Sequence, residues 1–481
     1  MSKLIRRATA VVLMCSLSGC AIVSPQLKPD VPVAGAWNEA APAEAAAVSP
    51  TWWTSFGSPE LQSLVAEALA GSPDLAIATE RVRQAEAQVR VAGASLFPVV
   101  NASAGASGGR TSKVGGTGSA KAAVVDSAAD VNLSASYELD LWGRNRAGVR
   151  SAESSAAASR FDRDAAQITL VSGVATSYFD VLALRARLAI ARENLDIAQQ
   201  VFDLVSARAR NGAASALDVS RQEATVLSQK AALLPLEQQE RQTLAALAVL
   251  VGRAPEGFDV KGTGITDLDV PAIDAGLPAE LLVRRPDLAS AEAQLAAANA
   301  DVAAARAAML PTITLTGSAG LASAALTSLT SAGATAAIQI AASLLQPVFD
   351  GGRLRGQKAI AESRERELLE TYRKAILSAF SDVEQALAGT SRLGQQEELQ
   401  DEVQTRARES LRLAEIRYRG GADDLLTVLD AQRTLFSAQD QLAQIQLSRL
   451  QAAVSLYKAL GGGWIEAQAN GAGGYTPRRT R

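Results

Sequence analysis

Hydrophobic positions along this chain follow two different periods. Residues 131–141 alternate strictly, with apolar side chains at odd positions and polar side chains at even positions, as in a strand with two unlike faces. From Leu184 to Ala209, apolar side chains instead recur alternately four and three positions apart, which is typical of a coiled-coil helix. The pattern therefore predicts short two-faced strands combined with long amphipathic helices.

Two of the predicted helices meet at a break at Asn211-Gly212. No proline occurs between Gly143 and Arg210, and a helix over that whole segment would be about 100 Å long. A second helix is expected to return from about 215 to 250. Pro235 lies inside this returning helix, where it removes a hydrogen bond and should cause a kink.

The same order of elements occurs twice. Segment 72–75 reads SPDL, and segment 285–288 reads RPDL, 213 residues later. Gly143-Arg144 recurs as Gly352-Arg353, 209 residues later. A period of this length indicates duplication of a large module rather than a solenoid repeat. Strand pairs are expected at about 99–108 with 130–141 and at about 312–320 with 335–346.

The N-terminal segment has the features of an export signal. Basic residues precede an apolar stretch at 8–17 that is too short to span a bilayer. It ends at Leu17-Ser18-Gly19-Cys20, which resembles a bacterial lipobox, although an ordinary signal peptide could also contain a cysteine. We expect a signal peptide at 1–19, a lipid-anchored arm at 20–58, a first repeat at 59–252, a linker at 253–285, a second repeat at 286–461 and a tail at 462–481.

Composition narrows the chemistry that the chain can perform. Histidine is absent, and the two cysteines include Cys15 in the expected signal peptide. No disulfide, metal site or catalytic constellation is expected, so neither an enzyme nor a cofactor beyond the lipid on Cys20 is predicted. Loss of the signal's three basic residues would leave 44 basic and 50 acidic residues, a net charge of about −6, which argues against nucleic acid as a partner.

The alternating strands fit two environments. Roughly ten alternating residues match a tilted transmembrane strand, but a strand of a soluble sandwich would show the same pattern. The export signal and the second copy favour the membrane. Four membrane strands would leave two unpaired edges, which lipid does not tolerate. The chain should therefore assemble into a closed barrel, with eight strands from two copies or twelve from three.

Two segments resemble the outer membrane factor family, the TolC-like exit ducts, and most closely its nodulation-type efflux lipoprotein branch. They are 284–288 (RRPDL) and 418–433, which contains YRGG followed by LLTVLDAQR. The resemblance covers essentially the whole mature chain. It implies an α+β membrane protein that forms a homotrimer, with a twelve-stranded outer-membrane β-barrel continued by a twelve-helix periplasmic α-barrel. The linker and the tail would form a girdle around the middle of the tunnel.

The resemblance also places a constriction at the periplasmic tip. The helices would turn there at Gly212, Gly420 and Gly421, and Asp430 matches a carboxylate that projects into the pore as a ring. Because Thr427 occupies the position of a second acidic residue in the family, a single strong ring is expected. Such a ring should favour cations over anions when the pore is narrow.

Five further residues near the tip are candidates for the constriction or its latch. Asp423 and Asp424 could line the pore, although acids at a helix start more often cap it. Tyr418 matches a residue that holds inner and outer helix pairs together in the family, with Arg419 and Arg210 as its expected partners. Ordinary coiled-coil packing is the alternative for Tyr418.

The function implied is a passive exit duct in the bacterial outer membrane. It would receive small toxic compounds from an inner-membrane pump through a periplasmic adaptor, and its lipid and strands would contact the outer membrane. A duct for type I protein secretion is one alternative. A non-transporting trimeric coiled-coil lipoprotein is another, although it would need neither alternating strands nor a duplicated half.

Overall fold

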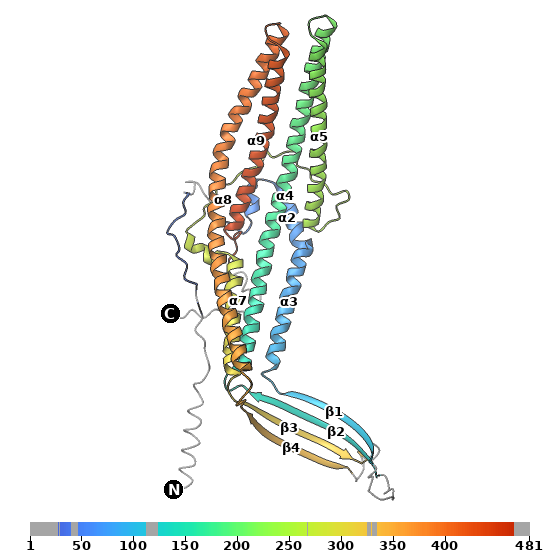
Figure 1. Cartoon of the computed structure of the whole chain (residues 1–481), viewed down its shortest axis with the longest axis vertical. Coiled ribbons are helices and arrows are strands. Elements are labelled where there is room, and N and C mark those ends of the chain that lie inside the picture. The colour runs from blue at the N-terminus through green and yellow to red at the C-terminus, as the bar shows by residue number, and fades with distance from the viewer. Residues whose placement is uncertain are drawn as a thin grey trace. The chain divides into compact units, whose positions relative to one another are not determined.

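A computed structural model describes most of the chain between residues 27 and 465 (Figure 1). The described residues are 27, 29–39, 47–111, 124–266, 268–324, 329 and 334–465. The expected signal peptide, Cys20 and the tail beyond 465 lie outside them. The chain divides into two compact units, named here the strand unit (1–29, 83–157 and 292–371) and the helix unit (30–82, 158–291 and 372–481).

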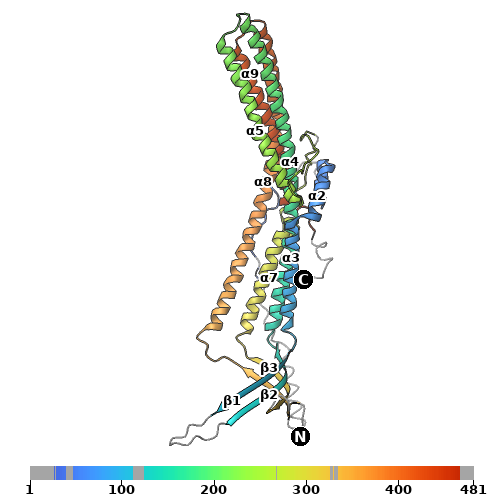
Figure 2. The same ribbon diagram turned by 90° about the vertical axis from the view of Figure 1, so that its right-hand side faces the viewer.

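The elements follow the duplicated order that the sequence predicts. They are η1 (Trp52–Phe56), α2 (Pro59–Gly71), α3 (Pro73–Ala94), β1 (Val99–Thr111), β2 (Val124–Leu139), α4 (Arg144–Arg210), α5 (Ala216–Val251), η2 (Pro278–Glu280), α6 (Leu281–Arg284), α7 (Pro286–Ala307), β3 (Thr312–Ser323), β4 (Thr335–Leu345), α8 (Arg353–Arg419) and α9 (Leu425–Ala459). Both ribbon views show α4 with α5, and α8 with α9, as helical hairpins (Figure 1 and Figure 2).

The bounds of the first two strands differ from the expected ones. β1 and β2 extend three and six residues further toward their connecting loop than predicted, because backbone pairing continues through Gly108, Gly109 and Ser127 without any apolar alternation to signal it. α5 is one helical element from Ala216 to Val251 with Pro235 inside it, and the kink expected there stays a prediction.

The four strands form one antiparallel sheet in the order β1-β2-β3-β4. Residues that pair directly across such a sheet share a face, so the register defines two faces. One face carries the apolar positions, which are Val100, Ala102, Val131, Leu133, Ala135, Tyr137, Leu139, Ile313, Leu315, Ala319, Leu321, Ala336, Ile338, Ile340, Ala342 and Leu344. The opposite face carries Asn101, Ser103, Asn132, Ser134, Ser136, Glu138, Thr314, Thr316, Ser318, Gln339 and Ser343.

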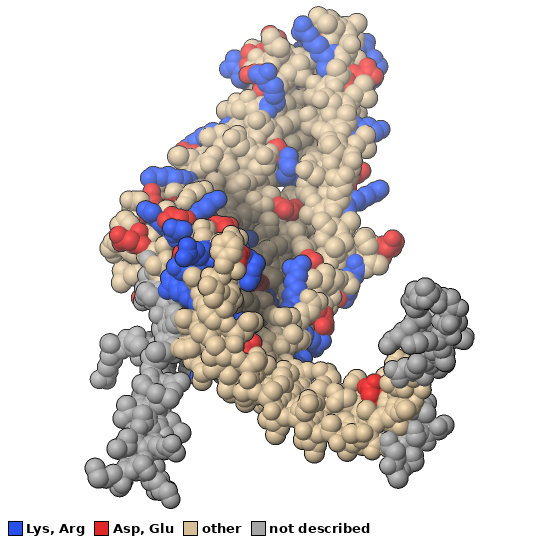
Figure 3. Space-filling model, turned by 60° about the horizontal axis from the view of Figure 1, so that its bottom comes forward, with Lys and Arg blue, Asp and Glu red and all other residues tan. Residues whose placement is uncertain are grey.

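The apolar face of the sheet is uncovered in the described chain. Leu133 is 52 % exposed, Ile338 81 % and Ile340 87 %. In a space-filling view, charged side chains are sparse over the strands (Figure 3). A soluble sandwich would cover its apolar face with a second sheet. The uncovered face therefore favours the membrane interpretation of the alternating pattern.

The core of the helix unit is built around a segment of the expected arm. Trp52 stacks on Tyr457 with ring centroids 4.8 Å apart, and Phe56 lies 5.0 Å from Phe179. Trp52 and Phe56 are 2 % and 0 % exposed. Further along the arm, the Trp37 indole donates a hydrogen bond to the Gly276 carbonyl oxygen at 2.9 Å. These aromatic anchors hold described parts of the arm on the body of the unit.

In both halves of the chain, a close backbone approach joins the end of the returning helix to the residue that precedes the SPDL or RPDL segment. Gly252 follows α5 with a φ of 80°, and a Cβ there would lie 2.3 Å from the Gly71 carbonyl oxygen. Gly461 follows α9 with a φ of 86°, and a Cβ there would lie 1.9 Å from the Arg284 carbonyl oxygen. These distances leave no room for any side chain, which explains why glycine recurs at this spacing.

Replacing Gly461 by alanine should destabilise the helix unit. A left-handed backbone costs of order 1–3 kcal/mol for a residue with a Cβ, and the collision with Arg284 adds to that cost. The measurement is the thermal midpoint of the helical circular dichroism signal. Gly421→Ala is the matched control, since Gly421 has a φ of 74° but no neighbouring atom within 4 Å. Equal thermal midpoints for the two variants would show that the close approach at Gly461 does not affect stability.

Candidate functional site at the helix turns

The two helical hairpins close with the same backbone geometry. Gly212 has a φ of 72° and Gly421 a φ of 74°. The Ala213 amide donates to the Arg208 carbonyl oxygen at 2.8 Å, and the Ala422 amide donates to the Arg417 carbonyl oxygen at 2.9 Å. These bonds satisfy the last carbonyl groups of α4 and α8 as helix-ending motifs do. The turns expected at the two glycines are therefore present.

The second turn contains a further glycine, Gly420, whose role differs from that of its neighbour. The Gly420 amide donates to the Ile416 carbonyl oxygen at 3.0 Å, as in a continuing helix. Gly420 is absent from the glycines with positive φ among the described residues. The change of direction therefore depends on Gly421.

Acidic side chains hold the starts of the returning helices. Asp424 is the N-cap of α9, and its carboxylate accepts hydrogen bonds from the amide and hydroxyl of Thr427 at 3.1 and 3.0 Å. In α5 the corresponding cap is Ser215, which forms a capping box with Asp218. Hydrogen bonds from the Ser215 backbone and hydroxyl lower the pKa of Asp218. These contacts give Asp424 the capping role that was the alternative to pore lining.

Asp423 stabilises the turn itself. Its Oδ2 accepts a hydrogen bond from Arg417 Nε at 2.6 Å, so the carboxylate joins the end of α8 to the segment that precedes α9. The two neighbouring acids of the sequence thus make separate local contacts.

Asp430 lies on an exposed face of α9 beside a cation. Its Oδ1 accepts a hydrogen bond from Arg433 Nη2 at 2.7 Å, and the two side chains are 65 % and 82 % exposed. An exposed pair of this kind contributes about 0–1 kcal/mol, so it can open readily. Arg433 was part of the motif quoted from the sequence, but helix spacing of three residues was the only signal for this partnership.

A groove of about 640 Å³ separates part of α5 from α9 at this level. Asp430 and Arg433 line it together with apolar side chains such as Leu426 and Phe436. Gln432 also lines it, and its side-chain amide has no hydrogen-bond partner among the described residues although it is 1 % exposed. The groove therefore combines an ion pair, an apolar wall and an amide near the turns.

Tyr418 joins the two hairpins through Arg208. The Arg208 guanidinium lies 4.5 Å from the centre of the Tyr418 ring, and its Nη1 donates a hydrogen bond to the Tyr418 carbonyl oxygen. Tyr418 is 5 % exposed and packs in an apolar cluster with Val201 and Val205 of α4. Burial raises the pKa of the Tyr418 hydroxyl, so the ring stays neutral at physiological pH.

The arginines expected to contact Tyr418 lie elsewhere. Arg419 pairs with Glu415 of its own helix at 3.5 Å, and no described contact joins Arg210 to Tyr418. The reason is helical spacing, because Arg208 follows Val201 and Val205 by seven and three residues and shares their face. Arg210 lies two positions further, on a different face of α4. The apolar seam of α4 could have identified Arg208 before the structure did.

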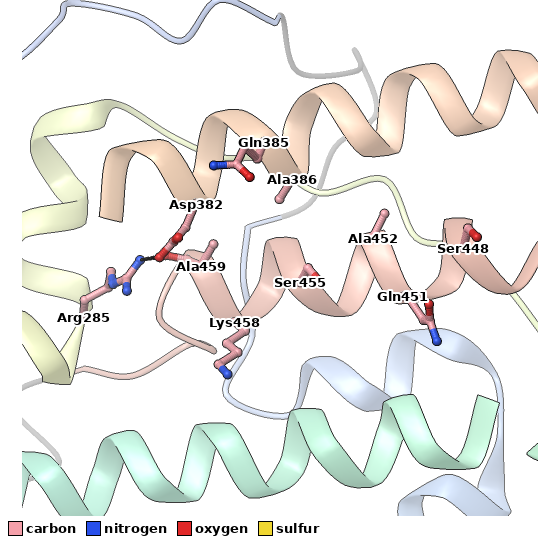
Figure 4. Close-up of a pocket in the computed structure, with 10 residues that line it drawn as sticks. All are labelled: Arg285, Asp382, Gln385, Ala386, Ser448, Gln451, Ala452, Ser455, Lys458 and Ala459. Atoms are coloured by element: carbon pink, nitrogen blue, oxygen red, sulfur yellow. Dashed lines mark hydrogen bonds and ion pairs between the residues drawn. The ribbon is translucent and has the colours of Figure 1, made fainter. Parts of the chain in front are cut away.

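A second polar site lies between α8 and α9, close to the start of α7 (Figure 4). Its cavity measures about 500 Å³. Arg285 lines it and bonds to Asp287, to Asp382 and to the Ala459 carbonyl oxygen, at 2.7–3.2 Å. The arginine of the RPDL motif thus holds the start of α7 against both α8 and the end of α9.

A half-buried carboxylate, that of Asp180, lies next to this cavity. Gln451, which lines the cavity, donates a hydrogen bond from Nε2 to Asp180 Oδ1 of α4 at 2.7 Å. Burial raises the pKa of Asp180 above 3.8, although the bond from Gln451 opposes the shift. The folded state therefore holds a proton on Asp180 more tightly than the unfolded chain does.

Two further features of the described residues concern other kinds of site. Among the described residues, no group of three or more His, Cys, Asp and Glu side chains is placed to hold a metal ion. One described helix, α4, has an 18-residue window apolar enough to cross a membrane, but 61 % of that window is buried inside the structure. Packing within the protein accounts for its apolar character.

Loss of Arg208 should loosen both turns. Arg208→Gln removes the cation above the Tyr418 ring, an interaction worth about 0.5–2 kcal/mol, and weakens the bond to its carbonyl group. We expect amide hydrogen exchange to become roughly tenfold faster in peptides covering 207–214 and 417–423, since tenfold corresponds to about 1.4 kcal/mol. Arg210→Gln is the control and should leave both peptides unchanged. Equal exchange rates in the two variants would contradict a stabilising contact between Arg208 and Tyr418.

Asp180→Asn should stabilise the protein at pH 7. A carboxyl whose folded pKa is raised contributes stability that is fully present below its unfolded value of 3.8 and is lost as pH rises through the folded pKa. The asparagine keeps an oxygen for Gln451 and removes the partly buried charge. The gain in thermal midpoint should vanish below about pH 4. Asp203→Asn, at an exposed Gln199–Asp203 contact on the same helix, should show no such gain.

Comparison with known proteins places these features in a family. The family model described as "Outer membrane efflux protein" matches residues 64–253 and 277–462, which are close to the two repeats. The chain is 45 % identical over 424 residues to the pyoverdine export outer membrane protein OpmQ of Pseudomonas aeruginosa, covering 86 % of this chain and 87 % of the relative. It is 43 % identical to OpmQ of Pseudomonas putida, covering 95 % and 98 %.

A further relative and a solved structure show the same similarity to outer membrane efflux proteins. The antibiotic efflux pump outer membrane protein ArpC of Pseudomonas putida is 35 % identical, over 94 % of this chain and 95 % of that protein. The open state of the MtrE outer membrane channel of Neisseria gonorrhoeae superposes with a TM-score of 0.82 at 32 % identity, covering 92 % and 98 %. The chain therefore belongs to the outer membrane efflux protein family, whose members are exit ducts of efflux systems in the outer membrane.

Proposed function

We propose that three copies of this chain form a passive duct that releases a secreted small molecule of the pyoverdine type. Their sheets would close into a twelve-stranded barrel in the outer membrane, continued by a twelve-helix tunnel in the periplasm. The observation that carries this proposal is the two-faced sheet, whose apolar face is uncovered and whose outer strands each pair on one side.

Backbone chemistry supports closure of the sheet by further copies. β1 pairs only with β2, and β4 only with β3, in the described chain. An unpaired N–H or C=O group in lipid costs several kcal/mol, so both edges require partners. If β4 of one copy pairs with β1 of the next, the apolar faces form a continuous outer surface. The Ser, Thr, Asn and Gln side chains then line a wet interior.

Similarity supports the choice of cargo. Relatives at 45 % and 43 % identity are named for pyoverdine export, whereas the relative named for antibiotic efflux is 35 % identical. A secreted small molecule is therefore a better-supported cargo than a toxic drug or a protein. Energy would come from an inner-membrane pump through a periplasmic adaptor, whose helices would dock in the grooves near the turns.

The tip would form the constriction of this duct. Three Asp430 carboxylates would face one another across a narrow pore, and Arg433 on the same helix would offset part of their charge. The weak pair allows Asp430 to exchange Arg433 for a passing cation. A lipid on Cys20 would add an anchor to the barrel.

The non-transporting stalk is less compatible with the geometry. A coiled-coil spacer needs the helical hairpins and the lipid anchor. It does not require a sheet with one mainly apolar face and one mainly polar face.

Charge at position 430 should set ion selectivity. Purified trimer in a planar bilayer should conduct and prefer K⁺ to Cl⁻. Asp430→Asn should lower that permeability ratio by roughly twofold or more, and Arg433→Gln should raise it, because screening is weak at close range in a narrow pore. Asp401→Asn, on an exposed position of α8, is the control. A trimer that never conducts, even as Asp430→Ala, would favour the stalk.

Deletion of the gene should trap the cargo inside the cell. We expect the secreted siderophore to fall at least severalfold in the medium and to accumulate in the periplasm, and a plasmid copy should restore release. The measurement is absorbance or mass spectrometry of both fractions. Normal siderophore release together with loss of a secreted protein would instead support the type I secretion duct.

A further inference from the structure

The internal duplication places different residues at equivalent positions of the two helix turns. Asn211 precedes Gly212 in the first turn, and Gly420 precedes Gly421 in the second, at an offset of 209 residues. The following glycines have nearly the same conformation, with a φ of 72° in the first turn and 74° in the second. The turns therefore agree in backbone at this point and differ in one side-chain amide.

The Asn211 side chain stabilises the end of α4 in the folded protein. Its Nδ2 donates a hydrogen bond to the Ala207 carbonyl oxygen at 2.8 Å, and the Asn211 backbone amide donates to the same oxygen at 3.3 Å. The second turn closes without a side chain at the equivalent position, because Gly420 is found there. The amide therefore supports the first turn without defining its backbone.

An asparagine that precedes a glycine can react with its own backbone. The glycine nitrogen loses its proton to water and bonds to the asparagine Cγ, ammonia leaves from Cγ, and a five-membered imide forms. Water then opens the ring at one of its two carbonyl carbons and gives aspartate or isoaspartate. The net reaction consumes one water and releases one ammonia. Glycine permits ring closure because it has no Cβ in the way, and asparagine is among the thermolabile residues.

The surroundings of the first turn leave room for this reaction. Asn211 and Gly212 are both exposed, so water reaches the reacting atoms. A Cβ placed on Gly212 would meet no atom within 4 Å, so no neighbouring group blocks a rearrangement of the turn. Among the described asparagines, Asn211 alone is followed by glycine.

Two hydrogen bonds restrain the reaction in the folded state. The Gly212 amide donates to the Ala209 carbonyl oxygen at 3.0 Å, so the attacking nitrogen is engaged. The bond from Asn211 Nδ2 to Ala207 holds the side chain on the last turn of α4. Attack requires both bonds to break, as they do when the end of a helix opens locally. The rate of conversion is then the open fraction multiplied by the rate in the open chain.

We propose that Asn211 is a site of spontaneous deamidation and that local opening of the first turn sets its rate. Conversion adds a negative charge at the C-terminal end of α4, where the helix macrodipole disfavours anions. It also removes the Nδ2 donor from the Ala207 carbonyl oxygen, and isoaspartate inserts a methylene group into the backbone. The first turn thus loosens irreversibly as the protein ages, whereas the second turn cannot change in this way.

The test is peptide mass spectrometry of the purified full-length protein during incubation at mildly alkaline pH. We expect the peptide containing Asn211 to convert to the acid roughly tenfold or more faster than the peptide containing Asn145, because Arg146 follows Asn145 and has a Cβ. The same protein unfolded in urea should convert faster at Asn211 than the folded protein. Folded protein in which Asn211 converts no faster than Asn145 would overturn the proposal.

Control of the rate by opening is tested with the arginine variants described above. Hydrogen exchange over 207–214 and conversion at Asn211 are measured on the same samples of wild type, Arg208→Gln and Arg210→Gln. The two rates should rise by the same factor, about tenfold in Arg208→Gln, because both reactions pass through the open turn. Conversion that stays constant while exchange rises, or rises while exchange stays constant, would overturn this control.

The second turn offers a matched transfer of the site. Gly420→Asn creates an Asn-Gly pair there, and a Cβ at Gly420 would have its nearest atom at 3.5 Å, so the side chain fits. The Gly421 amide donates to the Tyr418 carbonyl oxygen at 3.1 Å, as the Gly212 amide does in the first turn. We expect conversion at 420 within roughly threefold of that at Asn211, since the helix-ending bonds correspond. No conversion at 420 in folded protein would overturn the role given to the turn.

Two variants at position 211 test the consequence. Asn211→Gln should abolish conversion there, because its longer side chain would have to close a larger ring. Asn211→Asp should speed hydrogen exchange over 207–214 roughly two- to fivefold through the added charge and leave the circular dichroism spectrum unchanged. Unchanged exchange would show that conversion does not loosen the turn.

Conductance separates this inference from the proposed function. Conversion at Asn211 in a trimer that never conducts would contradict the duct alone. A conducting trimer in which Asn211 does not convert would contradict the deamidation site alone.

Discussion

The backbone of the four-stranded sheet imposes the strongest requirement on this protein. A strand in lipid must satisfy every N–H and C=O group within the protein, and the described chain satisfies those of β2 and β3 on both sides but those of β1 and β4 on one side. The apolar face adds a second requirement, because side chains such as Ile340 need a nonpolar environment. Both requirements are met if copies of the chain join edge to edge within a membrane.

Duplication links this requirement to the helices. Each repeat supplies two strands and one long helical hairpin. Copies that pair strand to strand would therefore also bring their helical hairpins together in the same order. The recurrent close approaches at Gly252 and Gly461 show that the two modules use one way of connecting their parts. The repeats have diverged where their surroundings differ. Ser215 caps α5 and Asp424 caps α9. At the start of α4, Arg144 and Arg146 form ion pairs with Glu138 and Asp140, whereas at the start of α8 Asp350 accepts hydrogen bonds from backbone amides.

The contacts at the turns act both within each hairpin and between the hairpins. Each turn is closed by backbone bonds and a helix cap. The described links between the hairpins at this level include the cation–π contact and hydrogen bond of Arg208 and an apolar cluster that joins Val201 and Val205 to Tyr418. Asp430 and Arg433 form an exposed pair that contributes little energy.

Much of the architecture was determined by the sequence alone, because hydrophobic periodicity and glycine spacing are local signals. They identified both strand pairs, both long helices, the breaks at Gly212 and Gly421 and the duplication. Tertiary structure decided which side chains meet. It selected Arg208 rather than Arg210 or Arg419 as the partner of Tyr418, because only Arg208 shares a face with the apolar seam of α4. It also assigned Asp424 to a helix cap, since a cap depends on distances between residues that no periodic pattern encodes.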